Sequence, residues 1–334
     1  MSELNTFKAL LVEETANKQF TLNIVNRLVS DLPENDLLVN VHYSSLNYKD
    51  ALSASGNKRV SAHFPHTPGI DAAGIVVRDN SGTFTPGDEV LVFGYDLGMN
   101  TPGGLGQMIS IPAKWAIKRP ENLSLKEAMS YGTGGLTAAL CIQKLEKMGA
   151  SPEDGPVAVT GSTGGVGSIS IALLKQLGYS VVAFSGKPEQ TEYLKSIGAD
   201  EVLHRDVLNE AADLPMGKER WAHGIDTLGG DYLSNLLKQI KSGGGVSACG
   251  LAASDSFSST VFPFIIRGVS LLGVDSVYIP LSDKQHIWHR VASDMKLPNL
   301  QNLCEEIPLE QTPEYLKRFI QAKVVGRYLV NLKN

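Results

Sequence analysis

The sequence has few cysteines and no pattern that would pair them. Of its 334 residues only three are cysteine, namely Cys141, Cys249 and Cys304, and they are widely spaced with no CxxC motif. An odd number of cysteines at such spacing argues against a disulfide framework. Each lies in an apolar stretch, so we expect buried, inert thiols.

Runs of basic residues and long apolar segments are also missing. The formal net charge is −5, and the lysines and arginines are scattered, so nucleic acid is not an expected partner. No apolar stretch approaches the roughly 20 residues that cross a bilayer, and the start MSELNTFKALLVEE alternates like a strand instead of forming a signal-peptide core. We therefore expect a cytoplasmic protein without a membrane partner.

What the sequence does contain is the composition of a globular α/β enzyme. Hydrophobic residues make up 43% of the chain and charged residues 19%, and there are 33 glycines. The length exceeds that of a single hydrophobic core, so two domains of roughly 100–200 residues each are expected.

Two regions with different periodicity define the expected domains. Up to about residue 125, short apolar segments alternate with Gly, Pro and Asn/Asp clusters, which favours an irregular antiparallel barrel. Its strands are expected at Lys8–Val12, Leu37–Tyr43, Ala73–Val77, Glu89–Phe93 and Met108–Ile111. A helix-capable stretch follows from Leu136 to Met148.

In the second region, after Asp154-Gly155-Pro156, buried strands alternate with amphipathic segments. The strands are expected at Val157–Thr160, Val181–Phe184, Glu201–Leu203, Ile225–Leu228, Val246–Cys249 and Leu271–Val274. Six such strands with helical connections indicate a doubly wound parallel sheet. The alternation stops near Val277, so we expect residues 1–127 and 277–334 to form one discontinuous domain and residues 128–276 to form the other.

A glycine-rich turn joins the first strand of this region to an amphipathic helix. Gly161-Ser162-Thr163-Gly164-Gly165-Val166-Gly167 follows the strand directly, and the apolar helical face from Val166 to Leu177 ends at Gly178. Glycines here permit a tight turn and close backbone approach, so that helix N–H groups and the helix dipole can meet a pyrophosphate. The spacing is GxxGxxG, a variant of the usual GxGxxG, and its strand-to-helix context favours a dinucleotide site over a chance turn.

The second strand of this region ends without an acidic residue. A fold that takes NAD normally places Asp or Glu there to bind the ribose 2′-hydroxyl. Here Phe184 is followed by Ser185-Gly186-Lys187, and Arg205 lies just beyond the third strand. A hydroxyl, a backbone amide, an ammonium and a guanidinium suit a 2′-phosphate, so the expected cofactor is NADPH. The alternative, that Lys187 and Arg205 are ordinary surface charges, stays open.

Three longer motifs resemble the medium-chain dehydrogenase/reductase superfamily. They are Pro68–Val76 (PGIDAAGIV), Gly87–Val90 (GDEV) and Gly132–Ala139 (GTGGLTAA), and the resemblance runs from end to end of the chain. Shorter motifs that look like those of its YhdH/YhfP group are Asn47–Asp50, Ser185–Lys187, Pro263–Val269 and Gly273–Ser276. The resemblance implies a GroES-like antiparallel β-barrel catalytic domain and a six-stranded Rossmann cofactor domain. Members of the group are called quinone oxidoreductases, and their best-defined activity is NADPH-dependent acryloyl-CoA reduction.

The resemblance also implies the residues of the site. The cofactor would lie between the domains, with its phosphates held by Thr163, Gly164, Gly165 and Val166 and its 2′-phosphate by Ser185, Gly186, Lys187 and Arg205. The nicotinamide end would be lined by Tyr48, Leu251, Ile265 and Ser276. A further family contact near residues 321–326 has only a weak motif in this chain and is left unassigned.

The zinc ligands of many superfamily members are missing. Where those enzymes carry an early Cys and a Gly-His-Glu triplet, this chain has Ser44–Asp50 and Gly69-Ile70-Asp71, and the loop with four close cysteines is absent. Two pairs of histidines lack the further ligands that zinc binding needs. We therefore expect no metal.

Without a metal or catalytic thiol, the expected chemistry is hydride delivery to a carbon that is already electrophilic. We expect transfer from NADPH to the β-carbon of an α,β-unsaturated carbonyl or short enoyl thioester, followed by protonation of the α-carbon. Tyr48 is the candidate proton donor or nicotinamide positioner, because a phenol stays protonated at neutral pH; the alternative is a structural aromatic that closes the cleft. Asn47 is the candidate for holding the carbonyl oxygen, and Asp50 for orienting loop backbone.

Other functions stay open from the sequence. A quinone reductase would use the same hydride donor with a flatter apolar site, whereas a zinc-free alcohol dehydrogenase lacks a group to take the hydroxyl proton. A non-catalytic NADPH-binding redox sensor or lens-type structural protein belongs to a different class. The resemblance suggests a homodimer through the edge strand near Leu271–Val274, and the pattern does not determine the acyl chain length or the coenzyme A handle.

Overall fold

The computed structural model describes residues 5–333, and within them the chain forms two compact units. The first unit comprises the residues up to Thr133, Val277–Ala292 and the residues from Leu300. The second comprises Gly134–Ser276 and Ser293–Asn299. The predicted domain limits differ from this division over residues 128–133 and 293–299, and as limits of folding domains they stay a prediction. In the described part of the chain, no helix is long and apolar enough to span a membrane.

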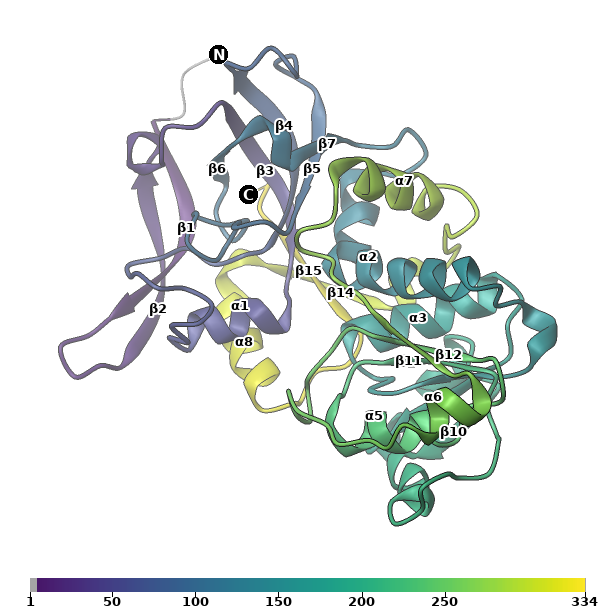
Figure 1. Ribbon diagram of the computed structural model, residues 1–334. Helices are drawn as coiled ribbons and strands as arrows, with labels where there is room; N and C mark the ends of the chain where they lie inside the picture. Colours follow the sequence, from purple (N-terminus) through teal and green to yellow (C-terminus); the bar gives the residue numbers. More distant parts are fainter. Residues whose placement is uncertain (1–4, 334) are drawn as a thin grey trace. The chain divides into compact units, whose positions relative to one another are not determined.

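A seven-stranded sheet is the centre of the first unit (Figure 1). Its strands are β3 (Leu37–Ser45), β4 (Asp71–Asp79), β5 (Glu89–Phe93), β6 (Met108–Ile111), β7 (Ala116–Lys118), β14 (Cys304–Pro308) and β15 (Arg327–Asn331). The order is β14-β15-β3-β4-β5-β7, and β6 pairs with β3. The strand pairings are antiparallel as expected, except that of β14 with β15, which are parallel because α8 (Thr312–Ile320) carries the chain back between them.

Two further strands, β1 (Thr6–Glu14) and β2 (Phe20–Leu28), form an antiparallel hairpin in the first unit. Leu10 and Val12 of β1 are buried in the core of the unit, and apolar residues of β2 pack against that core. Strand β1 was predicted from the sequence, but β2 and β7 were not. The alternation of apolar and polar residues in β2 was the signal available for it.

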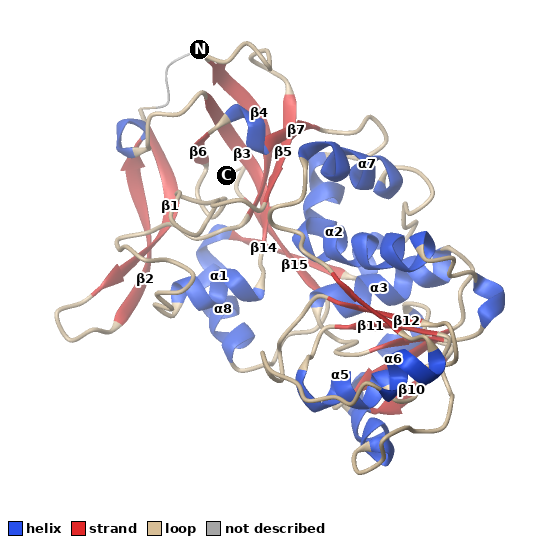
Figure 2. Ribbon diagram, viewed as in Figure 1, coloured by secondary structure: helices blue, strands red, loops and turns tan. Residues whose placement is uncertain are grey.

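Helices complete the first unit (Figure 2). They are α1 (Tyr48–Ala54), the first part of α2 (Leu125–Lys147), α7 (Leu281–Val291) and α8. A kink at Gly132, which has φ 52° and ψ −160°, interrupts α2. Helix α1 packs against α8, and α7 is anchored by Trp288, whose ring stacks on Phe93 with centroids 4.7 Å apart. Helix α1 was not predicted from the sequence, because a helix of 7 residues shows little periodicity.

The second unit contains a six-stranded parallel sheet. Its strands are β8 (Val157–Val159), β9 (Val181–Ser185), β10 (Glu201–His204), β11 (His223–Asp226), β12 (Gly245–Ala248) and β13 (Ser270–Gly273). The order β10-β9-β8-β11-β12-β13 is that of a dinucleotide-binding sheet. The prediction of a six-stranded Rossmann sheet is therefore confirmed, with each strand within two residues of its expected bounds.

Helices cover both faces of this sheet, with α3 on one face and α5 on the other (Figures 1 and 2). They are α3 (Gly165–Gln176), α4 (Thr191–Ser196), α5 (Gly230–Leu237) and α6 (Phe262–Arg267). Leu236 of α5 packs in a buried cluster with Ala158 and Val246 of the sheet. Because the strands are parallel, their carboxyl ends share one edge, where the loops after β8, β9, β10 and β12 meet.

Candidate cofactor and active sites

The glycine turn after β8 has the backbone of a phosphate-binding loop. Gly161 has φ 59°, in the left-handed region, and a Cβ on Gly167 would lie 2.4 Å from the carbonyl oxygen of Gly161. Helix α3 can approach the turn this closely only with glycine at both positions. Gly164 is the N-cap and brings no capping side chain, so a ligand can meet the first N–H groups of the helix. The predicted phosphate-binding residues Thr163, Gly164, Gly165 and Val166 all lie here.

A buried carboxylate supports this turn from the neighbouring strand. Asp226, the last residue of β11, accepts hydrogen bonds from Thr160 Oγ1 at 2.6 Å and from the Gly229 N–H at 2.8 Å. The Thr227 N–H donates to Thr160 Oγ1 at 3.0 Å and ties the two loops together. Burial raises the pKa of Asp226. Asp226 was not predicted as a site residue, although an acidic residue at the end of a buried strand was the available signal.

The residues expected around a 2′-phosphate lie together at the ends of β9 and β10. The Lys187 N–H donates to Ser185 Oγ at 2.9 Å. The Arg205 guanidinium lies against Gly186, where an added Cβ would be 3.1 Å from Arg205 Cζ, and over the Tyr232 ring, 5.4 Å from its centroid. Partial burial lowers the pKa of Lys187. Two basic residues, Lys187 and Arg205, therefore lie at this corner, and β9 ends in a serine rather than a carboxylate.

The residues expected near the nicotinamide are not all brought together. Leu251 follows β12 and is 61% exposed, and Ser276 follows β13. Both lie beyond the carboxyl ends of their strands, at the edge that carries the glycine turn. Ile265 is on α6, which ends at the opposite edge, because the Gly243 N–H just before β12 donates to the Arg267 carbonyl. The second unit therefore places Leu251 and Ser276 at the cofactor edge but not Ile265.

In the first unit, Asn47 and Tyr48 stand where β3 passes into α1. Tyr48 is the first residue of α1, its side chain is 49% exposed, and no hydrogen bond to its hydroxyl occurs among residues 5–333. Asn47 is buried, and its Nδ2 donates to Asp71 Oδ2 at 2.8 Å and to the Ser45 carbonyl at 3.3 Å, while Oδ1 accepts from Arg327. Both amide hydrogens are thus used within the protein. Asn47 has no donor left for a substrate carbonyl, the role expected for it.

Asn47 belongs to a buried polar group, which we name the Asp71 cluster. Its members are Ser45, Asn47, Asp50, Asp71, Thr133 and Arg327. Asp71 is fully buried and accepts hydrogen bonds from the Ser45 hydroxyl and from both the N–H and the hydroxyl of Thr133. The Arg327 guanidinium, 3.7 Å from Asp71 Oδ2, supplies the opposite charge. Gly132 leaves room for it, because a Cβ there would lie 2.3 Å from Arg327 Nη2.

Asp50 holds two loops together within this cluster. Its Oδ2 accepts from the Asn47 N–H at 2.8 Å, and its Oδ1 accepts from the Ile70 N–H at 2.9 Å. This is the backbone-orienting geometry expected for Asp50. Complete burial, with a smaller contribution from the charge of Asp71, raises the pKa of Asp50 to about 7. The carboxyl therefore carries a proton in the folded protein over a pH range in which an unfolded aspartate has lost it.

This difference predicts how stability changes with pH. Between about pH 4 and pH 7 the folded state binds the Asp50 proton and the unfolded state does not. Protonated Asp50 therefore contributes to the free energy of unfolding at low pH, and this contribution is lost as pH rises through about 7. The free energy of unfolding of the wild type, relative to Asp50→Asn, should fall by on the order of 1–4 kcal/mol over that range. Urea unfolding of both proteins at several pH values measures it.

The control for this experiment is Asp88→Asn. Asp88 is a surface carboxylate whose pKa is lowered, chiefly by the hydrogen bond from the Thr85 N–H. The contribution of Asp88 to the free energy of unfolding is lost only as pH falls. Above about pH 5 the free energies of unfolding of the wild type and of Asp88→Asn should therefore differ by a constant amount. If the free energies of unfolding of the wild type and of Asp50→Asn also differed by a constant amount above about pH 5, Asp50 would be ionised in the folded protein over that whole range.

The Asp71 cluster includes residues of the two segments, 44–50 and 69–71, where the family resemblance would place zinc ligands, and its residues do not fit zinc. The side chains are hydroxyl, amide and carboxylate groups rather than the thiolates and imidazoles of such sites. They already bind the buried guanidinium of Arg327, which a divalent ion would face at short range. No group of three or more His, Cys, Asp or Glu side chains in the described part of the chain is arranged to hold a metal ion.

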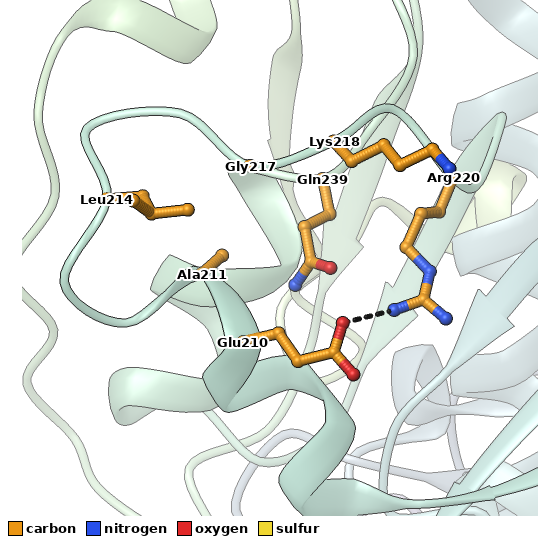
Figure 3. A pocket seen from close by; sticks show the side chains of 7 residues that line it. All are labelled: Glu210, Ala211, Leu214, Gly217, Lys218, Arg220 and Gln239. Carbon is orange, nitrogen blue, oxygen red and sulfur yellow. Dashed lines mark hydrogen bonds and ion pairs between the residues drawn. The ribbon is translucent and has the colours of Figure 1, made fainter.

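None of the candidate cofactor residues lines the pocket that Figure 3 shows on the second unit. It has a volume of about 330 Å³ and is lined by Glu210, Ala211, Leu214, Gly217, Lys218, Arg220 and Gln239. Arg220 and Glu210 form an ion pair of 3.0 Å there, drawn as the dashed line in Figure 3. The lining residues Arg220 and Gln239 precede β11 and β12, so the pocket lies at the amino edge of the sheet. It is not the candidate cofactor site.

Comparisons with known proteins agree with this architecture. The family model "Alcohol dehydrogenase GroES-like domain" matches residues 33–121, and "Zinc-binding dehydrogenase" matches residues 165–293. The "Putative quinone oxidoreductase YhfP" of Bacillus subtilis is 43% identical, with 98% of this chain and 99% of that protein covered. The "Probable acrylyl-CoA reductase AcuI" of Escherichia coli is also 43% identical, with 97% and 99% covered.

Solved structures show the same likeness along the whole chain. The yhdH oxidoreductase of Salmonella enterica in complex with NADP has a TM-score of 0.94 at 42% identity, with 98% of this chain and 100% of that one covered. Bacillus subtilis yhfP with NAD bound has a TM-score of 0.95 at 43% identity, with 98% and 99% covered. A GroES-like unit and a Rossmann unit define a dehydrogenase/reductase, and the chain belongs to the medium-chain dehydrogenase/reductase superfamily. Within that superfamily it is an oxidoreductase of the YhdH/YhfP-type group.

Proposed function

We propose that this protein is an NADPH-dependent, zinc-independent reductase of activated alkenes, acting on an α,β-unsaturated carbonyl or a short enoyl thioester such as acryloyl-CoA. The observation that carries the proposal is the basic corner of Ser185, Gly186, Lys187 and Arg205, which lies on the same sheet edge as the glycine turn. The printed names of the relatives, a quinone oxidoreductase and an acrylyl-CoA reductase, support a reductase of electron-poor substrates.

NADPH fits the residues that the second unit offers. Related structures have been determined with NADP and with NAD, so the choice between them depends on this chain's own residues. Lys187 and Arg205 provide two positive charges for a 2′-phosphate, and Gly165 and Val166 provide helix N–H groups for the pyrophosphate. Bound NADPH would supply the hydride that adds to the β-carbon of the substrate.

Tyr48 is the proposed proton donor. Hydride addition leaves an enolate, which needs a proton at its α-carbon, and a half-exposed phenol whose hydroxyl makes no hydrogen bond among residues 5–333 is a suitable general acid. Asn47 contributes by placing Tyr48, since its own amide is used by Asp71, Ser45 and Arg327. No step in this scheme requires a metal ion.

The experiment that tests the proposal is a substrate panel with NADPH. We expect short enoyl-CoA thioesters to be reduced with a higher kcat/KM than quinones, and a chelator to leave the rate unchanged. Metal analysis of protein purified without added zinc should find far less than one zinc per chain. A preference for quinones would support the second candidate, a quinone reductase. No turnover of either class would support a non-catalytic NADPH sensor, and loss of activity on chelation would contradict the zinc-independent assignment.

We also propose that the protein forms a homodimer through β13. This strand is at the edge of the parallel sheet, and Leu271 and Leu272 on it are only partly buried. An apolar edge strand is a surface that pairing with a second copy would cover. Sedimentation of the purified protein as a monomer at micromolar concentration would refute this assembly.

A further inference from the structure

Arg327, which no sequence motif singles out, contacts each of the three residues that precede Tyr48. We propose that Arg327 is a positioning residue, which holds the junction between β3 and α1 so that Tyr48 keeps the direction needed for proton donation. The proposal rests on the function proposed above for Tyr48. It adds a residue, Arg327, that touches neither the cofactor nor the substrate in that scheme.

The geometry of the junction carries the inference. Strand β3 ends at Ser45 and α1 begins at Tyr48, so only Leu46 and Asn47 separate them. Arg327 Nη2 donates to Ser45 Oγ at 2.8 Å. Arg327 Nη1 donates to the Leu46 carbonyl at 3.3 Å and to Asn47 Oδ1 at 3.0 Å. One guanidinium therefore binds three consecutive residues immediately before Tyr48.

Arg327 is itself fixed in place. It is the first residue of β15, only 3% of it is exposed, and Asp71 neutralises its charge within the cluster. The backbone bond from the Leu46 N–H to the Tyr328 carbonyl, 2.9 Å long, joins the same two segments beside it. A buried cation with these partners has little freedom to move, so it is a rigid support for the junction.

Arginine suits this place because its guanidinium is a planar fork. Two nitrogens of the fork reach acceptors that lie in different directions, whereas the single ammonium of lysine is a point charge on a flexible stem. Tyr48 needs such support because no hydrogen bond to its own hydroxyl occurs among residues 5–333. Its direction is consequently set by the first turn of α1, whose Asp50 and Ala51 N–H groups both donate to the Asn47 carbonyl.

The first test measures the junction directly, without substrate or cofactor. Arg327→Lys keeps the charge opposite Asp71 but loses the fork, and Asn47→Ser keeps an N-cap residue but cannot reach Arg327. In both folded variants, we expect hydrogen exchange at the first amides of α1 to be roughly tenfold faster than in the wild type, with the sheet of the second unit unchanged. Arg318→Lys, on the exposed face of α8, is the matched control and should not alter α1.

The second test is a double-mutant cycle between Arg327→Lys and Tyr48→Phe with an enoyl thioester. A displacement of about 1 Å can cost up to ~100-fold, so Arg327→Lys should lower kcat by roughly 10–100-fold with a smaller change in KM. In the Tyr48→Phe background it should lower kcat by less than about threefold, because the hydroxyl it positions is already gone.

The outcomes separate this inference from the proposed function. Faster exchange in α1 together with a non-additive cycle supports positioning by Arg327. Unchanged exchange in both variants, or an equal loss of kcat in both backgrounds, overturns it. If Tyr48→Phe keeps full turnover while exchange in α1 rises, Arg327 still positions the junction and the proton-donor role of Tyr48 is what fails. If Arg327→Lys does not fold, Asn47→Ser takes its place in both the hydrogen-exchange measurement and the double-mutant cycle with Tyr48→Phe.

Discussion

Tyr48→Phe should lower kcat for a short enoyl thioester by ~100-fold or more, because general acid assistance by a placed side chain is typically worth that much. The ring remains, so its packing and the first turn of α1 are retained. The dissociation constant for NADPH should therefore change only a few-fold. Steady-state kinetics give kcat, and fluorescence titration of the free enzyme gives the dissociation constant.

The control for this substitution is Tyr179→Phe in the second unit. Tyr179 is buried, and its hydroxyl donates to the Ala150 carbonyl at 3.0 Å. Tyr179→Phe therefore measures the effect of removing a tyrosine hydroxyl that lies outside the candidate active site. We expect it to reduce stability slightly and to leave kcat unchanged. If Tyr48→Phe behaved the same way, Tyr48 would be a packing aromatic and the proton would come from solvent.

The fold of the second unit was predictable because its signals are local. Each buried strand is a short apolar run bounded by turn residues, and the strand, glycine turn and helix from Val157 to Leu177 form one recognisable unit. The fold of the first unit was harder to predict from the sequence. Helix α1 has only 7 residues, and no residue of strand β2 is fully buried. The parallel pairing of β14 with β15 depends on a crossover that no local pattern specifies.

The candidate site divides in the same way. Gly164, Ser185 and Lys187 could be proposed from the sequence because they lie at or shortly after the ends of predicted strands. The Asp71 cluster was not found, since Arg327 is about 280 residues from the Asn47 that it contacts, and only the pairing of β15 with β3 brings them together. The role expected for Asn47 fails for a similar reason. Its amide hydrogens already go to the Ser45 carbonyl and to Asp71, which the pairing of β3 with β4 brings near, and a sequence motif does not show such partners.

The cofactor preference follows from two charges at the ends of β9 and β10. Lys187→Ala and Arg205→Ala should each weaken NADPH binding by roughly tenfold and leave NADH binding almost unchanged, because NADH has no phosphate for either charge to contact. A hydrogen bond to a charged group contributes about 1.5–3 kcal/mol, which corresponds to roughly 10–100-fold. Arg205 is exposed and its charge is screened by solvent, so the lower end of that range is expected.

The measurement compares NADPH and NADH by fluorescence titration of the wild type and of each variant at fixed salt. Arg220→Ala is the control, because Arg220 is a basic residue of the same unit that pairs with Glu210 at the opposite edge of the sheet. It should bind both cofactors as the wild type does. Raising the salt concentration should weaken NADPH binding more than NADH binding, since screening acts on the extra phosphate. A wild type that binds both equally, or variants that weaken both alike, would mean that Lys187 and Arg205 are ordinary surface charges and that the serine ending β9 does not select the phosphate.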